Sequence, residues 1–231
     1  MDSEQKTSVF EQIYQDYLRQ LRQVDLQRIA NRIGVETEGG SILVPLFGQL
    51  YKISSKGIVD PSGKEPIQSV KVVLCQYLLH MPAVEVDGQD WVSYKDFKDA
   101  SPFVGGFQSN TEKAIAKNFA GSLETLRRAC LQLGGKDPGL AWGYQLSMKF
   151  DPLPLIPILL LFNDADGEFS AQCLLLLERR AEKYLDMESV AILAWLLTDY
   201  LNQSHGDEDD GHVGPERIKK AKTWTISNSR C

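Results

Sequence analysis

The fold is decided by residues 142–200, WGYQLSMKFDPLPLIPILLLFNDADGEFSAQCLLLLERRAEKYLDMESVAILAWLLTDY, a stretch richer in apolar residues than the chain as a whole. In residues 144–150 apolar and polar side chains alternate, which is typical of a strand buried on one face. The apolar segment 155–162 predicts a second, fully buried strand. Within it Pro157 favours a sheet edge or a bulge, because proline cannot donate to a ladder. The stretch therefore predicts a packed core rather than an active site.

The rest of this stretch is interpreted as two helices. Residues 170–185 have leucine, alanine and tyrosine at helical spacing, so a helix is the simpler interpretation. The leucine run 174–177 could instead form a buried strand. Asp186 is a typical N-cap residue, and it predicts that the last helix begins directly after it.

The first eighty residues predict a helix, three strands and a second helix. Ser8 and Glu11 form a capping box, and apolar residues at helical spacing continue from there to a stop at Gly34. Short strands are predicted at residues 41–44, 50–53 and 58–59. Pro66 then precedes a helix over residues 67–80.

The middle of the chain has weaker signals. Residues 91–94 could form a short strand, or 94–99 one helical turn. Ser109 and Glu112 are interpreted as a second capping box that opens a helix to residue 119, and a further helix is predicted over 123–133. Helices and antiparallel strands mix without a βαβ rhythm. The sequence therefore predicts the α+β class, with antiparallel strands packed against amphipathic helices.

Composition excludes several classes of protein. The net charge of −6 over 231 residues argues against a general nucleic-acid binder and against a polybasic membrane patch. The longest apolar run, 153–162, is about half the length of a membrane span. The polar N-terminus lacks a secretory signal, so a soluble, cytoplasmic protein is expected.

The four cysteines are Cys75, Cys130, Cys173 and Cys231. They form no Cys-x-x-Cys pair, so the usual local ligand set of a zinc ion or an iron–sulfur cluster is missing. The first three lie among apolar residues and are expected to be buried, reduced thiols, as in a reducing cytoplasm.

Domain organisation follows from a change in composition near residue 203. Residues 1–202 are predicted to form one α+β domain. Residues 203–231 contain little apolar material to offset the entropy of ordering, so a polar, mobile tail is expected.

Asp164, Asp166 and Glu168 alternate in a turn, where their carboxylates could converge on calcium or magnesium. An EF-hand loop counted from Asp164 would need a glutamate at Leu175, so that motif fails. The alternative is an ordinary polar loop with Gly167 at a positive φ.

The remaining ligand-binding candidates are Gly105, Gly106 and Trp91. The glycine pair before a capped helix could present N–H groups to an anion, or form an ordinary loop. Trp91 could stack on a ligand or fill the core. His80 ends a helix, where its charge would interact with the dipole. No nucleophile elbow, phosphate-binding loop or metalloprotease motif is present, so no catalytic or metal-binding residue is assigned.

The order of features resembles the bacterial and archaeal domain-of-unknown-function family 3786. The resemblance spans about residues 10–200 and rests on segments 48–53, 77–79, 91–97, 154–157, 166–169 and 184–188. It implies one coherent domain. Some relatives look to be joined to an iron–sulfur domain, which implies a link to anaerobic redox metabolism, although this chain lacks that cysteine cluster.

The preferred hypothesis is a non-catalytic domain that binds a small ligand or a partner protein, because catalytic residue types are scarce and apolar faces abundant. The alternative is a carboxylate-based enzyme, with or without a metal ion, centred on Asp166 and Glu168. A third hypothesis, an electron-transfer accessory, would require a coloured bound group. No cofactor, specific partner or oligomeric state is assigned.

Overall fold

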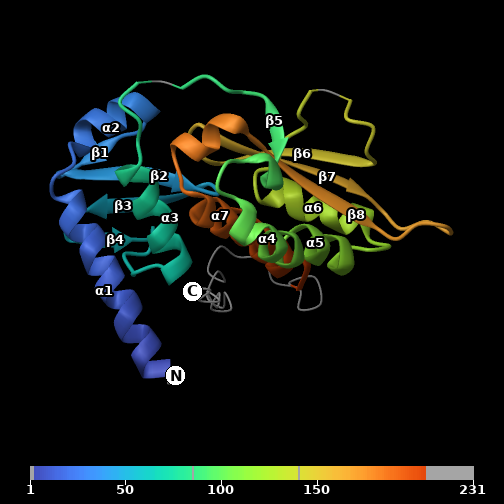
Figure 1. Cartoon of the computed structure of the whole chain (residues 1–231), viewed down its shortest axis with the longest axis horizontal. Coiled ribbons are helices and arrows are strands. Elements are labelled where there is room, and N and C mark those ends of the chain that lie inside the picture. The colour runs from blue at the N-terminus through green and yellow to red at the C-terminus, as the bar shows by residue number, and fades with distance from the viewer. Residues whose placement is uncertain (1–2, 85, 140, 207–231) are drawn as a thin grey trace.

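The chain forms two antiparallel four-stranded sheets with helices packed around them (Figure 1). A computed structural model describes residues 3–84, 86–139 and 141–206. The first sheet has the order β1-β2-β3-β4, with β1 Thr37–Glu38, β2 Ser41–Leu46, β3 Gln49–Ser54 and β4 Gly57–Val59. The second has the order β5-β8-β7-β6, with β5 Trp91–Ser93, β6 Leu146–Leu153, β7 Ile156–Asn163 and β8 Gln172–Glu178. The predicted α+β class is confirmed.

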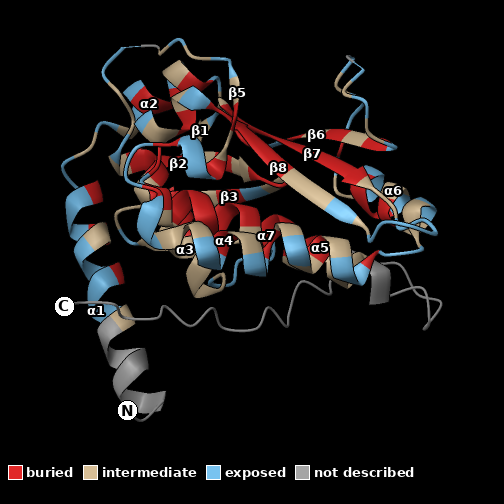
Figure 2. Ribbon diagram, turned by 45° about the vertical axis from the view of Figure 1, so that its right-hand side comes forward, coloured by how far each residue is buried: buried red, intermediate tan, exposed pale blue. Residues whose placement is uncertain are grey.

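The longest helix, α7, packs against four other helices, and its buried residues belong to the same hydrophobic cluster as those of the second sheet (Figure 2). The helices are α1 Ser3–Leu21, α2 Leu26–Ile33, α3 Gln68–Leu79, α4 Val104–Asn110, α5 Glu112–Asn118, α6 Leu123–Gln132 and α7 Met187–Gly206. Short 3₁₀ turns are η1 Tyr94–Asp96, η2 Ser101–Phe103 and η3 Arg179–Lys183. None of the helices in the described ranges is long and apolar enough to span a bilayer.

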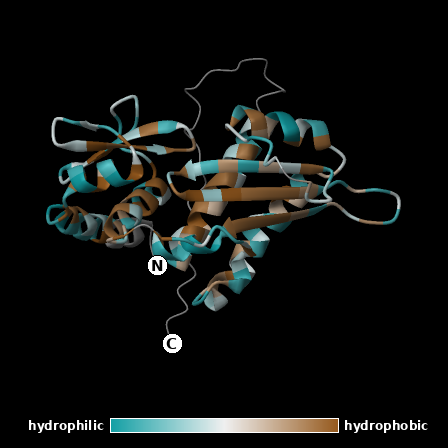
Figure 3. Cartoon of the chain, turned by 90° about the horizontal axis from the view of Figure 1, so that it is seen from above, coloured by the Kyte–Doolittle hydropathy of each residue, from teal (hydrophilic) through white to brown (hydrophobic). Residues whose placement is uncertain are grey.

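Both sheets contribute to one connected hydrophobic cluster. The backbone N–H of Phe47, in the β2–β3 turn, donates to the carbonyl of Pro152 in β6 at 2.9 Å. The Phe47 ring meets Tyr200 of α7 edge-on, with centroids 5.3 Å apart. Apolar residues run along the strands of the second sheet (Figure 3). The two sheets are therefore joined by a hydrogen bond and by shared packing on α7.

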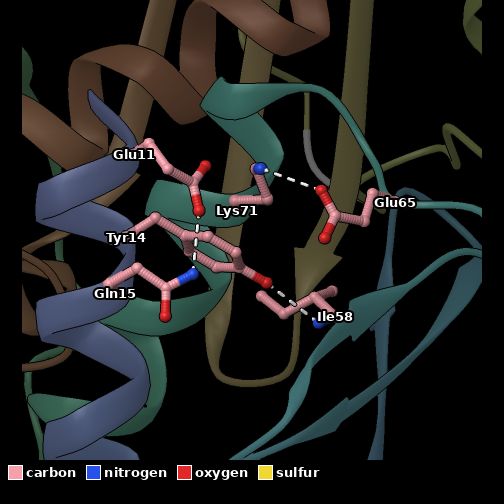
Figure 4. Close-up of polar contacts among 6 residues, drawn as sticks. All are labelled: Glu11, Tyr14, Gln15, Ile58, Glu65 and Lys71. Carbon is pink, nitrogen blue, oxygen red and sulfur yellow. Dashed lines mark hydrogen bonds and ion pairs between the residues drawn. The ribbon is translucent and has the colours of Figure 1, made fainter. Parts of the chain in front are cut away.

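Helix α1 is fixed to the first sheet through Tyr14 (Figure 4). The Tyr14 hydroxyl accepts the backbone N–H of Ile58 in β4 at 3.0 Å, and the side chain is only 4% exposed. Lys71 of α3 places its ammonium 4.2 Å from the ring centroid of Tyr14 and 3.3 Å from a Glu65 carboxylate oxygen. Burial raises the pKa of Tyr14 to about 12, so the hydroxyl stays neutral at physiological pH.

Replacing Tyr14 by phenylalanine is expected to lower the free energy of unfolding by about 1–3 kcal/mol, because the buried Ile58 N–H loses its acceptor. Chemical denaturation followed by circular dichroism measures this. The matched control is Tyr144→Phe, which removes a half-buried hydroxyl that has no hydrogen bond with any residue the structure describes. Equal losses in the two variants would contradict a bridging role for Tyr14.

The N-terminal helix prediction was wrong in two respects. The helix starts at Ser3, so Ser8 lies inside it rather than at its cap, and it ends at Leu21. A separate helix, α2, begins after Asp25, whose carboxylate accepts the N–H of Arg28 at 3.0 Å. Asp25 interrupts the helix because its side chain competes for a backbone N–H. The stop at Gly34 is confirmed, with φ of 69°.

The helix predicted over 170–185 was wrong, and the strand alternative was right. Residues 172–178 form β8, followed by the 3₁₀ turn η3. Leu175 and Leu177 face the main core, while Leu174 and Leu176 pack in a second cluster on the opposite face. A strand covered on both faces has an apolar run without alternation, so its spacing also fits a helix.

The other boundaries differ in detail. Pro157 lies in an interior strand, opposite the register shift between Phe150 and Leu153, as the bulge alternative of the prediction had it. The predicted strands of the first sheet, the helix 67–80 and the Asp186 cap are confirmed; the Asp186 carboxylate accepts the N–H of Ser189 at 2.7 Å. Helix α7 continues to Gly206, so 203–206 are helical, and the rest of the predicted tail lies outside the described residues.

Candidate functional site

The acidic turn lies in the loop between β7 and β8, at the right of Figure 1. One Asp164 oxygen accepts N–H groups from Gly121 at 2.6 Å and Ala165 at 2.8 Å. One Asp166 oxygen accepts from Glu168 at 2.8 Å and Phe169 at 2.7 Å, and these bonds lower the pKa of Asp166. Asp164 therefore ties the loop to Gly121, just before α6, and Asp166 fixes the turn of the loop itself.

These carboxylates do not converge on a common point. Across the described ranges, no group of three or more histidine, cysteine, aspartate or glutamate side chains is arranged to hold a metal ion. Glu168 lies exposed at the loop tip. Gly167 does not adopt the positive φ that the polar-loop interpretation assigned to it, because the Asp166 carboxylate shapes the turn instead.

The structure places the other sequence candidates apart from one another. Gly105 and Gly106 lie exposed in the seven-residue helix α4, so the predicted loop was wrong, and their binding of an anion stays a prediction. Trp91 begins β5, opposite Glu178, and packs half-buried on the outer-face leucine cluster. His80 is the C-cap of α3, with its ring nitrogen 3.1 Å from the carbonyl of Gln76.

A cavity of about 90 Å³ opens where β5 ends, and none of the candidate residues above lines it. Strand β5 stops at Ser93, which pairs with Leu176, and the chain turns into η1. Strand β8 continues past it, α5 packs on β8, and α4 packs on α5. The cavity is lined by Ser93, Tyr94, Lys95, Val104, Phe107, Gln108, Glu112 and Leu174.

Glu112 is the cavity's central polar group. It is the first residue of α5, but its carboxylate reaches β8 and accepts the backbone N–H of Leu175 at 3.1 Å. The carboxylate therefore takes the place of the strand partner that β5 no longer supplies. Burial raises the pKa of Glu112, opposed by the Leu175 N–H and by the ammonium groups of Lys95 and Lys113. The predicted capping box with Ser109 was wrong, because Ser109 lies inside α4.

Two aromatic rings form the rigid wall of the cavity. Tyr94 and Phe107 stack with centroids 4.1 Å apart and planes 6° from parallel. Both rings are almost fully buried, and the Tyr94 hydroxyl donates to the carbonyl of Met187 at 2.6 Å. The stacking and the Tyr94 hydrogen bond hold the rings in place, so the surface is preformed, which lowers the entropic cost of binding.

The polar groups of the cavity are few and varied. Its lining contains a carboxylate, an ammonium, an amide and two hydroxyls, but neither histidine nor cysteine. Nearby Cys173 has a pKa raised well above its usual value, first by burial and then by the Glu112 carboxylate. A thiol that stays protonated is a poor nucleophile.

Cys75 and Cys130 are buried and free, as predicted, whereas Cys173 is free but only half-buried, so its predicted burial was wrong. Burial raises the pKa of Cys75 to about 12. Cys231 lies outside the described residues.

Taken together, the fold and the site define an α+β protein with two antiparallel sheets and one small, charged cavity at the end of a short edge strand. The chain belongs to the family described as Domain of unknown function (DUF3786), whose model matches residues 25–200. The resemblance stated from the sequence is therefore confirmed, and all cavity residues lie inside the matched range. No curated protein and no solved structure matches the chain.

Part of the cavity could have been found from the sequence. Ser93, Tyr94 and Lys95 belong to the segment 91–97 that carried the resemblance. Glu112 was noticed only as a helix cap, because its contact with Leu175 joins residues 63 positions apart. The segment that carried the resemblance therefore contains one wall of the cavity, and no local pattern connects Glu112 with that wall.

Proposed function

We propose that the protein is a non-catalytic domain that binds a small polar ligand, and that its binding site is the cavity around Glu112. The observation that carries the proposal is the half-buried carboxylate of Glu112, fixed by the Leu175 N–H beside a preformed aromatic wall. Small-ligand sites commonly combine apolar walls with a few placed polar groups. A cavity of about 90 Å³ accepts roughly four non-hydrogen atoms, on the scale of a 150 Å³ cavity that holds benzene. It therefore takes a very small molecule or one end of a larger one.

The carboxylate-based enzyme at Asp166 and Glu168 is the weaker alternative. The Asp166 oxygen that would serve as a base already accepts two backbone N–H groups, which favour its charged form and lower its pKa. An effective general base at neutral pH instead has a pKa near 7. Glu168 lies exposed on the same loop.

The proposal includes a domain formed by residues 1–202 in the cytoplasm. The shared hydrophobic cluster of the two sheets supports the single domain. The free, buried thiols of Cys75 and Cys130 support a reducing compartment. The link to anaerobic redox metabolism stays a prediction of the family resemblance.

The proposal predicts that small polar compounds perturb the cavity and leave the acidic loop unchanged. A mixture of small polar fragments, added to isotope-labelled protein, should shift the backbone NMR signals of Lys95, Gln108 and Leu175. Val104→Trp should abolish these shifts, because the indole fills the cavity that Val104 lines.

The matched control is Val84→Trp, at a position 71% exposed and outside the cavity lining, which should leave the shifts intact. Shifts confined to residues 164–168, or shifts that persist in Val104→Trp, would contradict the assignment of this cavity.

A further inference from the structure

We infer that the cavity recognises a compact zwitterion, with the ligand's ammonium group directed at Glu112 and its carboxylate at Lys95. This inference rests on the proposed function and adds the chemical class of the ligand. It follows from the two opposite charges in the lining and from their different exposure.

The inner charge is the carboxylate of Glu112. One oxygen accepts the Leu175 N–H, and no N–H or O–H group of the described residues donates to the other oxygen. A half-buried carboxylate with a vacant acceptor is stabilised by a bound cation, which pairs with it where water is partly excluded. The inner end of the ligand should therefore carry N–H donors and a positive charge.

The outer charge is the ammonium of Lys95 on η1. Lys95 is exposed although it lines the cavity, so it stands at the mouth rather than in the interior. It forms no ion pair within the part of the chain that the structure describes. A simple cation would be attracted by Glu112 but repelled by Lys95. A simple anion would be attracted by Lys95 but repelled by Glu112. A zwitterion satisfies both charges.

The uncharged lining fits the carbon skeleton between the two charged groups. Val104 and Leu174 supply aliphatic surface, and Tyr94 and Phe107, stacked on each other, supply aromatic surface. Ser93 and Gln108 add neutral donors and acceptors that can meet the polar ends.

The test compares three probes by NMR titration at matched ionic strength: glycine, methylamine and acetate. Glycine should bind tightest and should shift the signals of Lys95 and Leu175. Glu112→Gln keeps an oxygen for the Leu175 N–H but removes the charge, so glycine binding should weaken about tenfold or more. Lys95→Gln should remove the preference for glycine over methylamine.

Two matched variants control for loss of charge alone. Glu124→Gln changes a carboxylate on α6 that is 75% exposed, and Lys98→Gln changes an exposed lysine three positions after Lys95; neither should alter glycine binding. Because Lys95 is exposed, its variant tests the inference even where Glu112→Gln fails to fold.

The inference is overturned if methylamine or acetate binds as tightly as glycine. It is also overturned if none of the three probes binds while the fragment mixture still shifts the cavity signals, and the proposed function then survives. If neither the probes nor the mixture shifts those signals, the proposed function itself fails.

Discussion

Replacing Arg180 by methionine is expected to lower the free energy of unfolding by about 3–5 kcal/mol, because it leaves a buried carboxylate unpaired. The Arg180 guanidinium contacts one oxygen of Glu178 through two nitrogens, each at 2.6 Å. The two side chains are only 12% and 9% exposed. Glu178 is the last residue of β8 and pairs with Trp91 of β5, so an uncompensated charge there would strain the sheet at the edge that frames the cavity.

The neighbouring residue supplies the control for this prediction. Arg179 forms a comparable ion pair with Asp90 at 2.8 Å, but these side chains are 46% and 56% exposed. Exposed pairs contribute about 0–1 kcal/mol, so Arg179→Met should be nearly neutral. Adding Glu178→Leu to Arg180→Met should restore most of the loss, since both charges are then gone. Urea unfolding followed by circular dichroism measures all three variants, and equal losses at Arg179 and Arg180 would refute the buried-pair argument.

The elements that the sequence predicted well are those whose chemistry is local. Asp186 caps α7 through the N–H of Ser189, three residues away, and Gly34 ends α2 with a left-handed backbone. Gly40 and Gly48 directly precede β2 and β3 of the first sheet, where their turn signals act within a few residues. Each of these signals is contained in a short window of the chain, so no tertiary contact is needed to interpret it.

The failures share a tertiary cause. Strand β8 resembles a helix in sequence because both of its faces are covered, and only the neighbouring β5 and β7 define it as a strand. The pair Gly105-Gly106 lies in a helix although each glycine costs about 1 kcal/mol relative to alanine there. The following residue, Phe107, is buried and stacked on Tyr94, and this packing outweighs the low helix propensity.

The candidate sites show the same difference between local signals and tertiary contacts. The hydrogen-bonding role of the acidic turn is local, and the polar-loop alternative described it correctly except for the conformation of Gly167. The cavity is assembled from η1, α4, α5 and β8, and its central contact joins Glu112 to Leu175. A carboxylate that begins one helix and bonds to a distant strand leaves no local sequence pattern. The sequence therefore shows a glutamate at position 112 but does not show that Leu175 is its partner.

The second large effect is expected at the centre of the second sheet, where Leu160→Ala should lower the free energy of unfolding by about 2–5 kcal/mol. Leu160 is fully buried in β7, between Met148 of β6 and Leu175 of β8. Truncation removes apolar contacts and leaves a cavity that two paired strands prevent from collapsing. The matched control is Leu50→Ala in β3, a strand leucine that is 48% exposed and should cost less than about 1 kcal/mol.

The Leu160 variant also separates global stability from the ligand site. Because Leu175 lies beside Leu160 and donates to Glu112, a void beneath β8 should loosen the Glu112 contact and speed hydrogen exchange of the Leu175 amide. The exchange rate of that amide in Leu160→Ala and Leu50→Ala measures this coupling. An unchanged Leu175 amide in a strongly destabilised Leu160 variant would mean that α5 alone holds the carboxylate, independently of the packing below the strand.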